Sequence, residues 1–158
     1  KSGVVRLDTN TKNGDLSFAS LAIAGDIVGC ETMLFGAYTF SASALTHCEL
    51  TPWPEGEPAG ASESLLESLA LAQRRAADVI ALRGGQASER VLGLIRLLGD
   101  GAGRVVLPTR QDIADITDLR FETISRIIKG LERLGVLLPV KMKGVHATRA
   151  YAVDLSVI

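Results

Sequence analysis

Two short helical patterns joined by a tight turn stand in the last third of the chain, and they constrain its fold more than any other feature. Thr109 and Asp112 lie three residues apart. This is the spacing of a helix N-cap residue and the acidic residue of a shortened capping box, so the pair predicts the start of a short helix. Residues 117–119 predict a turn, and residues 121–134 predict a longer helix that stops at Gly135. Two helices joined by a turn of three or four residues form a helix-turn-helix.

The residues that follow this motif predict a β-hairpin. An apolar strand is expected at 136–140, a turn at 141–144 (Lys-Met-Lys-Gly) and a second strand at 150–155. Another helix is expected before the motif, at 88–98. We therefore predict a C-terminal winged helix-turn-helix domain over residues 86–158.

The longer helix is strongly amphipathic. At 100° per residue, five aliphatic side chains fall within about 120° of one another. These are Ile124, Ile127, Ile128, Leu131 and Leu134. The opposite face carries Glu122, Ser125, Arg126, Lys129 and Arg133. One side of the helix is expected to pack and the other to face outward.

The outward face presents groups that match the edges of base pairs. Arg126 can donate two hydrogen bonds to guanine O6 and N7, Glu122 can accept one from cytosine N4, and Ser125 can contact either base type. A charged helix face is usually only solvated. A carboxylate beside DNA, however, is repelled by the phosphates and is unfavourable unless it accepts a hydrogen bond from a base. The sequence therefore predicts double-stranded DNA as the partner, with these three residues as base contacts.

Contacts to the phosphate backbone are expected from a second set of residues, most of them near the starts of the two helices. They are Thr109, Arg110, Gln111, Thr123 and Lys129. The charge distribution agrees with this placement, since residues 1–103 carry a net charge of −4 and residues 104–158 carry +3.

The first part of the chain is organised differently. Over residues 1–58, short apolar segments alternate with turns, including a hairpin turn at 12–15 (Lys-Asn-Gly-Asp), and no helical spacing is seen. Two further strands are expected at 38–50, followed by a breaker at 51–54 and a connector at 54–62 rich in Pro, Gly and Glu. The fold class is therefore predicted as α+β, beginning with short antiparallel strands.

A long helix is expected over residues 62–85, capped by Ser62 or Ser64. Its small and aliphatic residues recur at spacings of four and three, a period near 3.5 that favours pairing with another helix. The stripe consists of Leu65, Leu69, Ala72, Ala76 and Val79. Either two copies form a parallel dimer seam, or the stripe packs on the strands of its own chain.

Several function classes lack their signatures. Cys30 and Cys48 stand apart with no ligand spacing, so no metal site is expected, and His47 and His146 are isolated from any Ser-His-Asp arrangement. No phosphate loop or paired carboxylates appear, so an enzyme is not expected. The apolar runs are too short to cross a bilayer, and a cytoplasmic protein without membrane contact is the expectation.

The helix-turn-helix segment resembles a known family. Residues 107–114 (Leu-Pro-Thr-Arg-Gln-Asp-Ile-Ala) and 121–126 (Phe-Glu-Thr-Ile-Ser-Arg) look like the CRP/FNR superfamily of bacterial transcription regulators. Upstream, residues 25–29 and 40–48 resemble the β-roll effector domain of that family, which is cupin-like, and the long helix falls where the family has its dimerisation helix. The resemblance implies a partial β-roll over 1–58, with strands before residue 4 that are either truncated or lie outside a fragment.

What the resemblance implies for function is specific. It implies a homodimer that binds a pseudo-palindromic site with two recognition helices about 34 Å apart and that recruits or blocks RNA polymerase. Glu122, Ser125 and Arg126 fit the Glu-x-x-Ser-Arg form of the FNR and FixK branch, which implies a TTGAT-like half-site. The alternative is a winged-helix domain that mediates protein contacts without specific DNA binding.

The chain departs from the family pattern at two places. Tyr38-Thr39 stands where an Arg-Ser pair would hold the phosphate of a cyclic nucleotide, and Arg75-Ala76 stands where the cyclic AMP receptor has hydroxyls. Cyclic AMP is therefore not expected as an effector, and no cofactor is predicted. In the helix-turn-helix, Asp118 and Arg120 replace the usual turn Gly and Ser or Thr cap, at a cost of about 1 kcal/mol for the cap.

Overall fold

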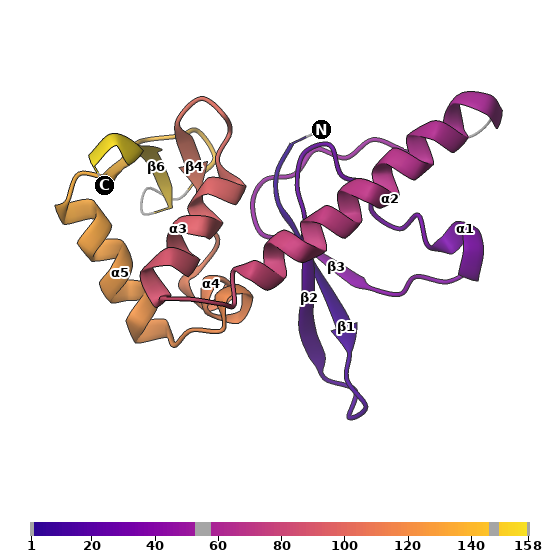
Figure 1. Cartoon of the computed structure of the whole chain (residues 1–158), viewed down its shortest axis with the longest axis horizontal. Helices are drawn as coiled ribbons and strands as arrows, with labels where there is room; N and C mark the ends of the chain where they lie inside the picture. Colours follow the sequence, from indigo (N-terminus) through magenta and orange to yellow (C-terminus); the bar gives the residue numbers. More distant parts are fainter. Residues whose placement is uncertain (1, 53–57, 146–148, 158) are drawn as a thin grey trace. The chain divides into compact units, whose positions relative to one another are not determined.

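A computed structural model describes residues 2–52, 58–145 and 149–157 and divides the chain into two compact units, Lys1–Val79 and Ile80–Ile158 (Figure 1). Small antiparallel sheets and helices make up both units, so the predicted α+β class is confirmed. Trp53 and Pro54 of the predicted breaker, part of the 54–62 connector, and His146 lie outside the described residues.

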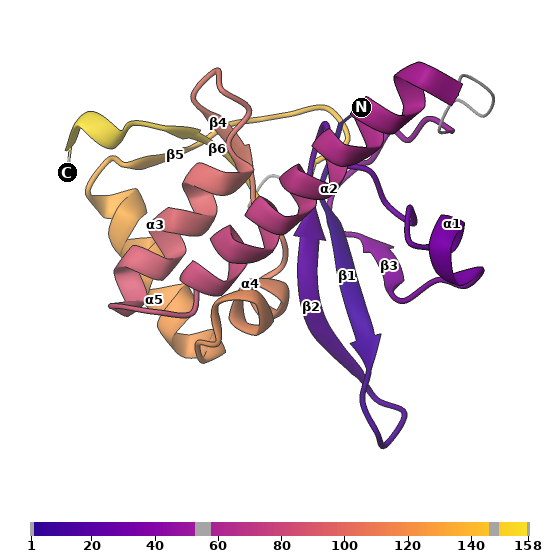
Figure 2. The ribbon, with the colours of Figure 1, turned by 45° about the vertical axis from the view of Figure 1, so that its right-hand side comes forward.

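The first unit is built on a three-stranded sheet. Strands β1 (Val5–Asn10), β2 (Leu16–Ala22) and β3 (Ser41–Ala44) pair antiparallel in the order β2-β1-β3 (Figure 2). The predicted hairpin turn joins β1 to β2, where Gly14 adopts a φ of 85° and the Thr11 amide donates to the Asp15 carbonyl at 2.8 Å. A β-bulge between Leu7 and Asp8 shifts the register of this pair.

Two expectations for this unit are wrong. Residues 32–35 form a short helix, α1 (Thr32–Phe35). A helix of one turn is too short to produce a recognisable helical period in the sequence. In 38–50 only one of the two expected strands forms among the described residues, β3, followed by an isolated bridge between Ser2 and Glu49. The Thr46 hydroxyl accepts from the Val4 amide at 2.9 Å, a side-chain bond that replaces regular strand pairing there.

The long helix α2 runs Pro58–Ala81, so positions 62 and 64 lie inside it and not at its start, where the cap was expected. Proline is well suited to the first position of a helix, since its fixed φ is already helical and its missing N–H would have had no partner there. The segment up to residue 62, whose turn-rich composition predicted a connector, therefore includes the first residues of α2.

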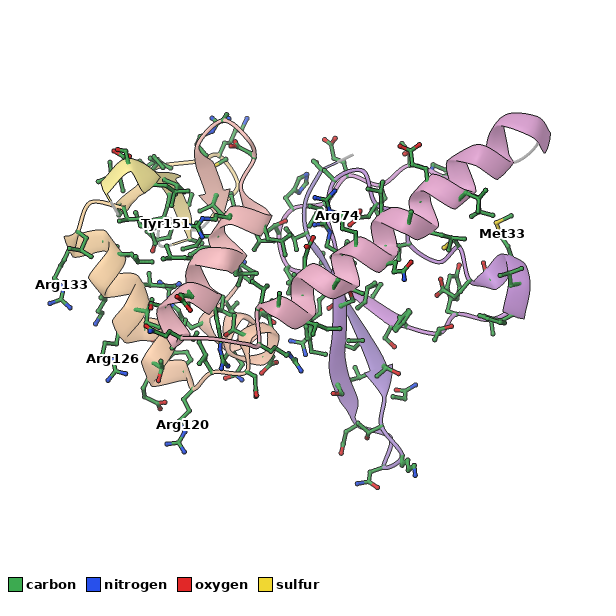
Figure 3. All side chains as sticks on the ribbon, in the orientation of Figure 1. Met33, Arg74, Arg120, Arg126, Arg133 and Tyr151 are labelled. Atoms are coloured by element: carbon green, nitrogen blue, oxygen red, sulfur yellow. The ribbon has the colours of Figure 1, made fainter. Side chains whose placement is uncertain are left out.

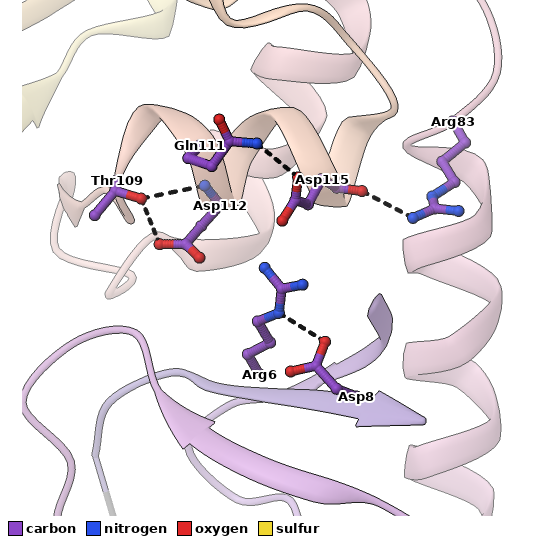
Figure 4. Close-up of polar contacts among 7 residues, drawn as sticks. All are labelled: Arg6, Asp8, Arg83, Thr109, Gln111, Asp112 and Asp115. Carbon is purple, nitrogen blue, oxygen red and sulfur yellow. Dashed lines mark hydrogen bonds and ion pairs between the residues drawn. The ribbon is translucent and has the colours of Figure 1, made fainter. Parts of the chain in front are cut away.

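Two largely buried ion pairs stabilise the first unit. Arg75 on α2 lies 3.2 Å from the Asp26 carboxylate, whose second role is to accept from the Ile23 amide at 2.9 Å. Arg6 pairs with Asp8 at 2.8 Å (Figure 4). The side chains of both aspartates are less than a tenth exposed, so each carboxylate depends on its guanidinium partner.

The second unit combines three helices and a three-stranded sheet. The helices are α3 (Ala87–Leu98), α4 (Arg110–Thr117) and α5 (Phe121–Arg133). The strands are β4 (Arg104–Val106), β5 (Leu137–Pro139) and β6 (Ala150–Val153), in the order β4-β6-β5, with a 3-10 turn η1 (Leu155–Val157) after them. The two helices of the motif and the two strands after it form as predicted, while β4 was not anticipated because three residues carry too little pattern.

One residue of the predicted packing face of α5 is exposed. Ile124, Ile128 and Leu131 are buried, but Leu134 is 60% exposed. Leu134 is the C-cap of the helix and keeps a right-handed conformation (φ −77°, ψ −7°), so it lies at the edge of the apolar face, and Gly135 turns the chain after it with a φ of 78°.

No helix in the described ranges is both long and apolar enough to span a membrane. Within the same residues, no group of three or more His, Cys, Asp or Glu side chains is placed to hold a metal ion.

Candidate nucleic-acid interface

Helix α4 is fixed at its start by the predicted cap. The Asp112 amide donates to the Thr109 hydroxyl oxygen at 3.1 Å, and Asp112 places a carboxylate in the first turn, where the helix dipole favours negative charge (Figure 4). Gln111 donates from its side-chain amide to the Asp115 carboxylate at 3.0 Å. Thr109 and Gln111 therefore already have partners within the helix.

The end of α4 is held by contacts that the sequence did not reveal. Arg83 donates to the carbonyls of Asp115 and Ile116 at 2.8 and 3.1 Å, and Arg90 donates to that of Thr117 at 3.3 Å. Cationic side chains at a helix C-terminus donate hydrogen bonds to its unpaired carbonyls and interact favourably with the negative end of its dipole. The sequence shows that basic residues precede the motif, but which carbonyls their side chains contact depends on the tertiary structure.

The turn between α4 and α5 keeps its shape without glycine. Asp118 adopts a left-handed conformation with φ 52° and ψ 49°, and its amide donates to the Ala114 carbonyl. Aspartate tolerates this conformation better than most residues. Arg120 occupies the N-cap position of α5 and provides no side-chain cap, as expected from its side chain.

Helix α5 presents its polar face to solvent. Glu122, Arg126, Lys129 and Arg133 are exposed, and Ser125 is half-buried beside them. Figure 3 shows Arg120, Arg126 and Arg133 extending outward from this helix on the same side. The three residues predicted to contact bases thus share one side of a helix whose opposite side is anchored by Ile124 and Ile128, both with no exposed area.

The residues predicted to contact phosphates are placed less uniformly. Lys129 is exposed, and Thr123 is half-buried in the first turn of α5. Arg110 begins α4 and is also half-buried, with its guanidinium Nη2 at 3.5 Å from the Tyr151 hydroxyl. Two residues outside the predicted set, Arg120 and the 48%-exposed Phe121, stand at the start of α5.

The stripe on α2 is only partly accessible in the single chain. Leu69 and Ala72 are exposed, Leu65 and Ala76 are half-buried, and Val79 is 3% exposed. Leu66 and Ile80, which lie outside the predicted stripe, are 68% and 71% exposed.

The region matched to a nucleotide pocket is occupied by contacts of the chain itself. The Glu31 carboxylate accepts from the Thr39 amide at 3.3 Å, and the neighbouring Tyr38 is exposed. Arg75 is engaged with Asp26 and with Asp78, at 3.2 and 3.5 Å.

A capped short helix, a tight turn, an exposed second helix and a β-hairpin together define the second unit as a winged helix-turn-helix. No model of a protein family matches the sequence. The chain is 36% identical over 151 residues to the nitrogen fixation regulation protein FixK of Bradyrhizobium diazoefficiens, which covers 85% of this chain and 63% of that protein. It is 35% identical over 153 residues to FixK of Azorhizobium caulinodans, covering 86% and 61%.

Solved structures share the fold over nearly the whole chain. A CRP-family transcriptional regulator from Thermus thermophilus superposes with a TM-score of 0.73 at 24% identity, covering 99% of this chain and 82% of that one. FixK2 from Bradyrhizobium japonicum gives 0.62 at 25% identity, covering 97% and 79%. The chain is thus similar in sequence to the two FixK proteins and shares the fold of the CRP-family regulator, and it spans somewhat less than two thirds of the curated FixK proteins that it matches.

Proposed function

We propose that this chain is a sequence-specific DNA-binding transcription regulator that reads a TTGAT-like half-site with α5. The observation that carries the proposal is the outward placement of Glu122 and Arg126, with Ser125 beside them, on a helix anchored from behind by buried isoleucines. A carboxylate, a hydroxyl and a guanidinium within one and a half turns can contact cytosine N4 and guanine O6 and N7 in the major groove. The similarity to the FixK proteins supports the same function.

The proposal extends to a homodimer on a pseudo-palindromic site. The exposed leucine and alanine at Leu69 and Ala72 support a seam along α2, and the exposed Leu66 lies next to this stripe. Two copies joined there would present two α5 helices to half-sites about 34 Å apart. Contact with RNA polymerase and a cytoplasmic location belong to the same proposal.

We further propose that the chain acts by binding, without catalysis and without cyclic AMP. Tyr38 and Thr39 offer no guanidinium to a cyclic phosphate, and Arg75 is neutralised by Asp26 within the chain. A buried phosphate without a cationic partner would be destabilised by several kcal/mol.

Fluorescence anisotropy with the full chain tests the proposed function. We expect a labelled TTGAT-N4-ATCAA duplex to bind at least about a thousandfold more tightly than a scrambled duplex of equal length and composition, as specific regulators do. The comparison is made at one fixed salt concentration, because phosphate contacts make affinity salt-dependent. Equal affinity for the two duplexes would favour a winged-helix domain that contacts proteins.

A further inference from the structure

A buried tyrosine joins three elements of the second unit. Tyr151 lies in the central strand β6, where it pairs with Val105 of β4 and Pro139 of β5, and only 2% of the residue is exposed. Its hydroxyl donates to the Glu132 carboxylate on α5 at 2.8 Å and accepts from Arg110 Nη2 on α4 at 3.5 Å. One hydroxyl thus lies between an acid near the end of the candidate recognition helix and a base at the start of the preceding helix.

The chemistry of the hydroxyl suits this double role. A phenol can donate one hydrogen bond and accept another, whereas a phenyl ring can do neither. Burial raises the pKa of Tyr151 above its ordinary value of 10, so the hydroxyl keeps its proton at neutral pH and can donate to Glu132.

The hydroxyl bonds to two side chains of opposite charge. Arg110 and Glu132 are both half-buried and both lie within hydrogen-bonding distance of the same oxygen. Without that oxygen, we expect the flexible guanidinium to turn toward the carboxylate, because the two opposite charges attract each other. An arginine paired in this way is less available to a phosphate.

We propose that Tyr151 is a positioning residue for DNA binding, which directs Arg110 toward a backbone phosphate and links it to α5. The proposal rests on the proposed function, in which Arg110 contacts a phosphate. It assigns to the wing strand β6 a role in binding that needs no contact between that strand and DNA.

The test is the salt dependence of binding by the full chain carrying Tyr151→Phe. Each phosphate contact adds about 0.9 to the magnitude of the slope of log K against log salt. We expect the variant to lose about that amount and to bind the specific duplex about tenfold more weakly. Arg110→Ala should show the same loss of slope, and the double variant should lose no more than Arg110→Ala.

Two further variants separate positioning from stability. Tyr38→Phe removes the other tyrosine hydroxyl of the chain, which is exposed in the first unit, and should leave the slope unchanged. Glu132→Gln keeps an oxygen that accepts from Tyr151 and should also retain the slope. If Tyr151→Phe lowers only the melting temperature while the slope is retained, or if its effect adds fully to that of Arg110→Ala, the positioning role is wrong.

The outcome is separable from that of the proposed function. If the unmodified chain shows no preference for the TTGAT duplex, the proposed function fails. If it shows that preference and Tyr151→Phe keeps both affinity and slope, the function stands and only the positioning role is overturned.

Discussion

Replacing Arg126 with alanine should weaken binding to the TTGAT-N4-ATCAA duplex by about 1–3 kcal/mol, which is about 5- to 150-fold in the dissociation constant. The guanidinium is exposed on α5, and its removal would delete the two hydrogen bonds that we propose it makes to guanine O6 and N7. Because the lost bonds are to a base, the variant should also lose its discrimination against duplexes in which that G·C pair is changed. Anisotropy titrations on the matched set of duplexes measure both effects.

Arg133→Ala is the control for this result. It removes the same charge from the same helix, about two turns nearer the C-terminus, where Arg133 donates to the Lys129 carbonyl at 3.3 Å. We expect a smaller loss that is similar on all duplexes. An equal loss on specific and scrambled DNA for Arg126→Ala would mean that Arg126 supplies only charge.

The largest effect on stability is expected from Ile124→Ala. Ile124 has no exposed area and anchors the first turns of α5 from behind, so its truncation removes buried contacts and leaves a cavity. Such changes reduce the free energy of unfolding by about 2–5 kcal/mol. Urea denaturation followed by far-ultraviolet circular dichroism should show the corresponding fall in the midpoint of the transition that involves this unit.

Ile127→Ala is the matched control, since the same atoms are removed from a half-buried position on the same helix. It should lower stability clearly less than Ile124→Ala. Comparable effects of the two variants would show that α5 does not pack through the face described above.

The helix-turn-helix was predictable because its signals are local. The Thr109 cap, the helical period of α5 and the Gly135 stop each act within a few residues, and the structure has α4 and α5 within one residue of the expected bounds. The start of α2 was missed because a proline reads both as a breaker and as the first residue of a helix.

The features that could not be predicted depend on long-range contacts. Arg83 reaches the end of α4 across 32 residues, and Arg110 reaches Tyr151 across 41. The burial of Val79 within the predicted α2 stripe likewise depends on what packs against it, which no helical period specifies. For the candidate interface, the exposure of Glu122 and Arg126 followed from periodicity, but the environment of Arg110 did not.

A double-mutant cycle between Arg126 and the guanine of the TTGAT half-site tests the central claim most directly. Anisotropy titrations compare the unmodified chain and Arg126→Ala, each on the normal duplex and on one in which 7-deazaguanine removes the N7 acceptor of that base. If α5 lies in the major groove as proposed, the modified base should weaken binding of the unmodified chain and leave that of Arg126→Ala almost unchanged. Full additivity of the two changes would contradict it, because the guanidinium and the base would then not be in contact.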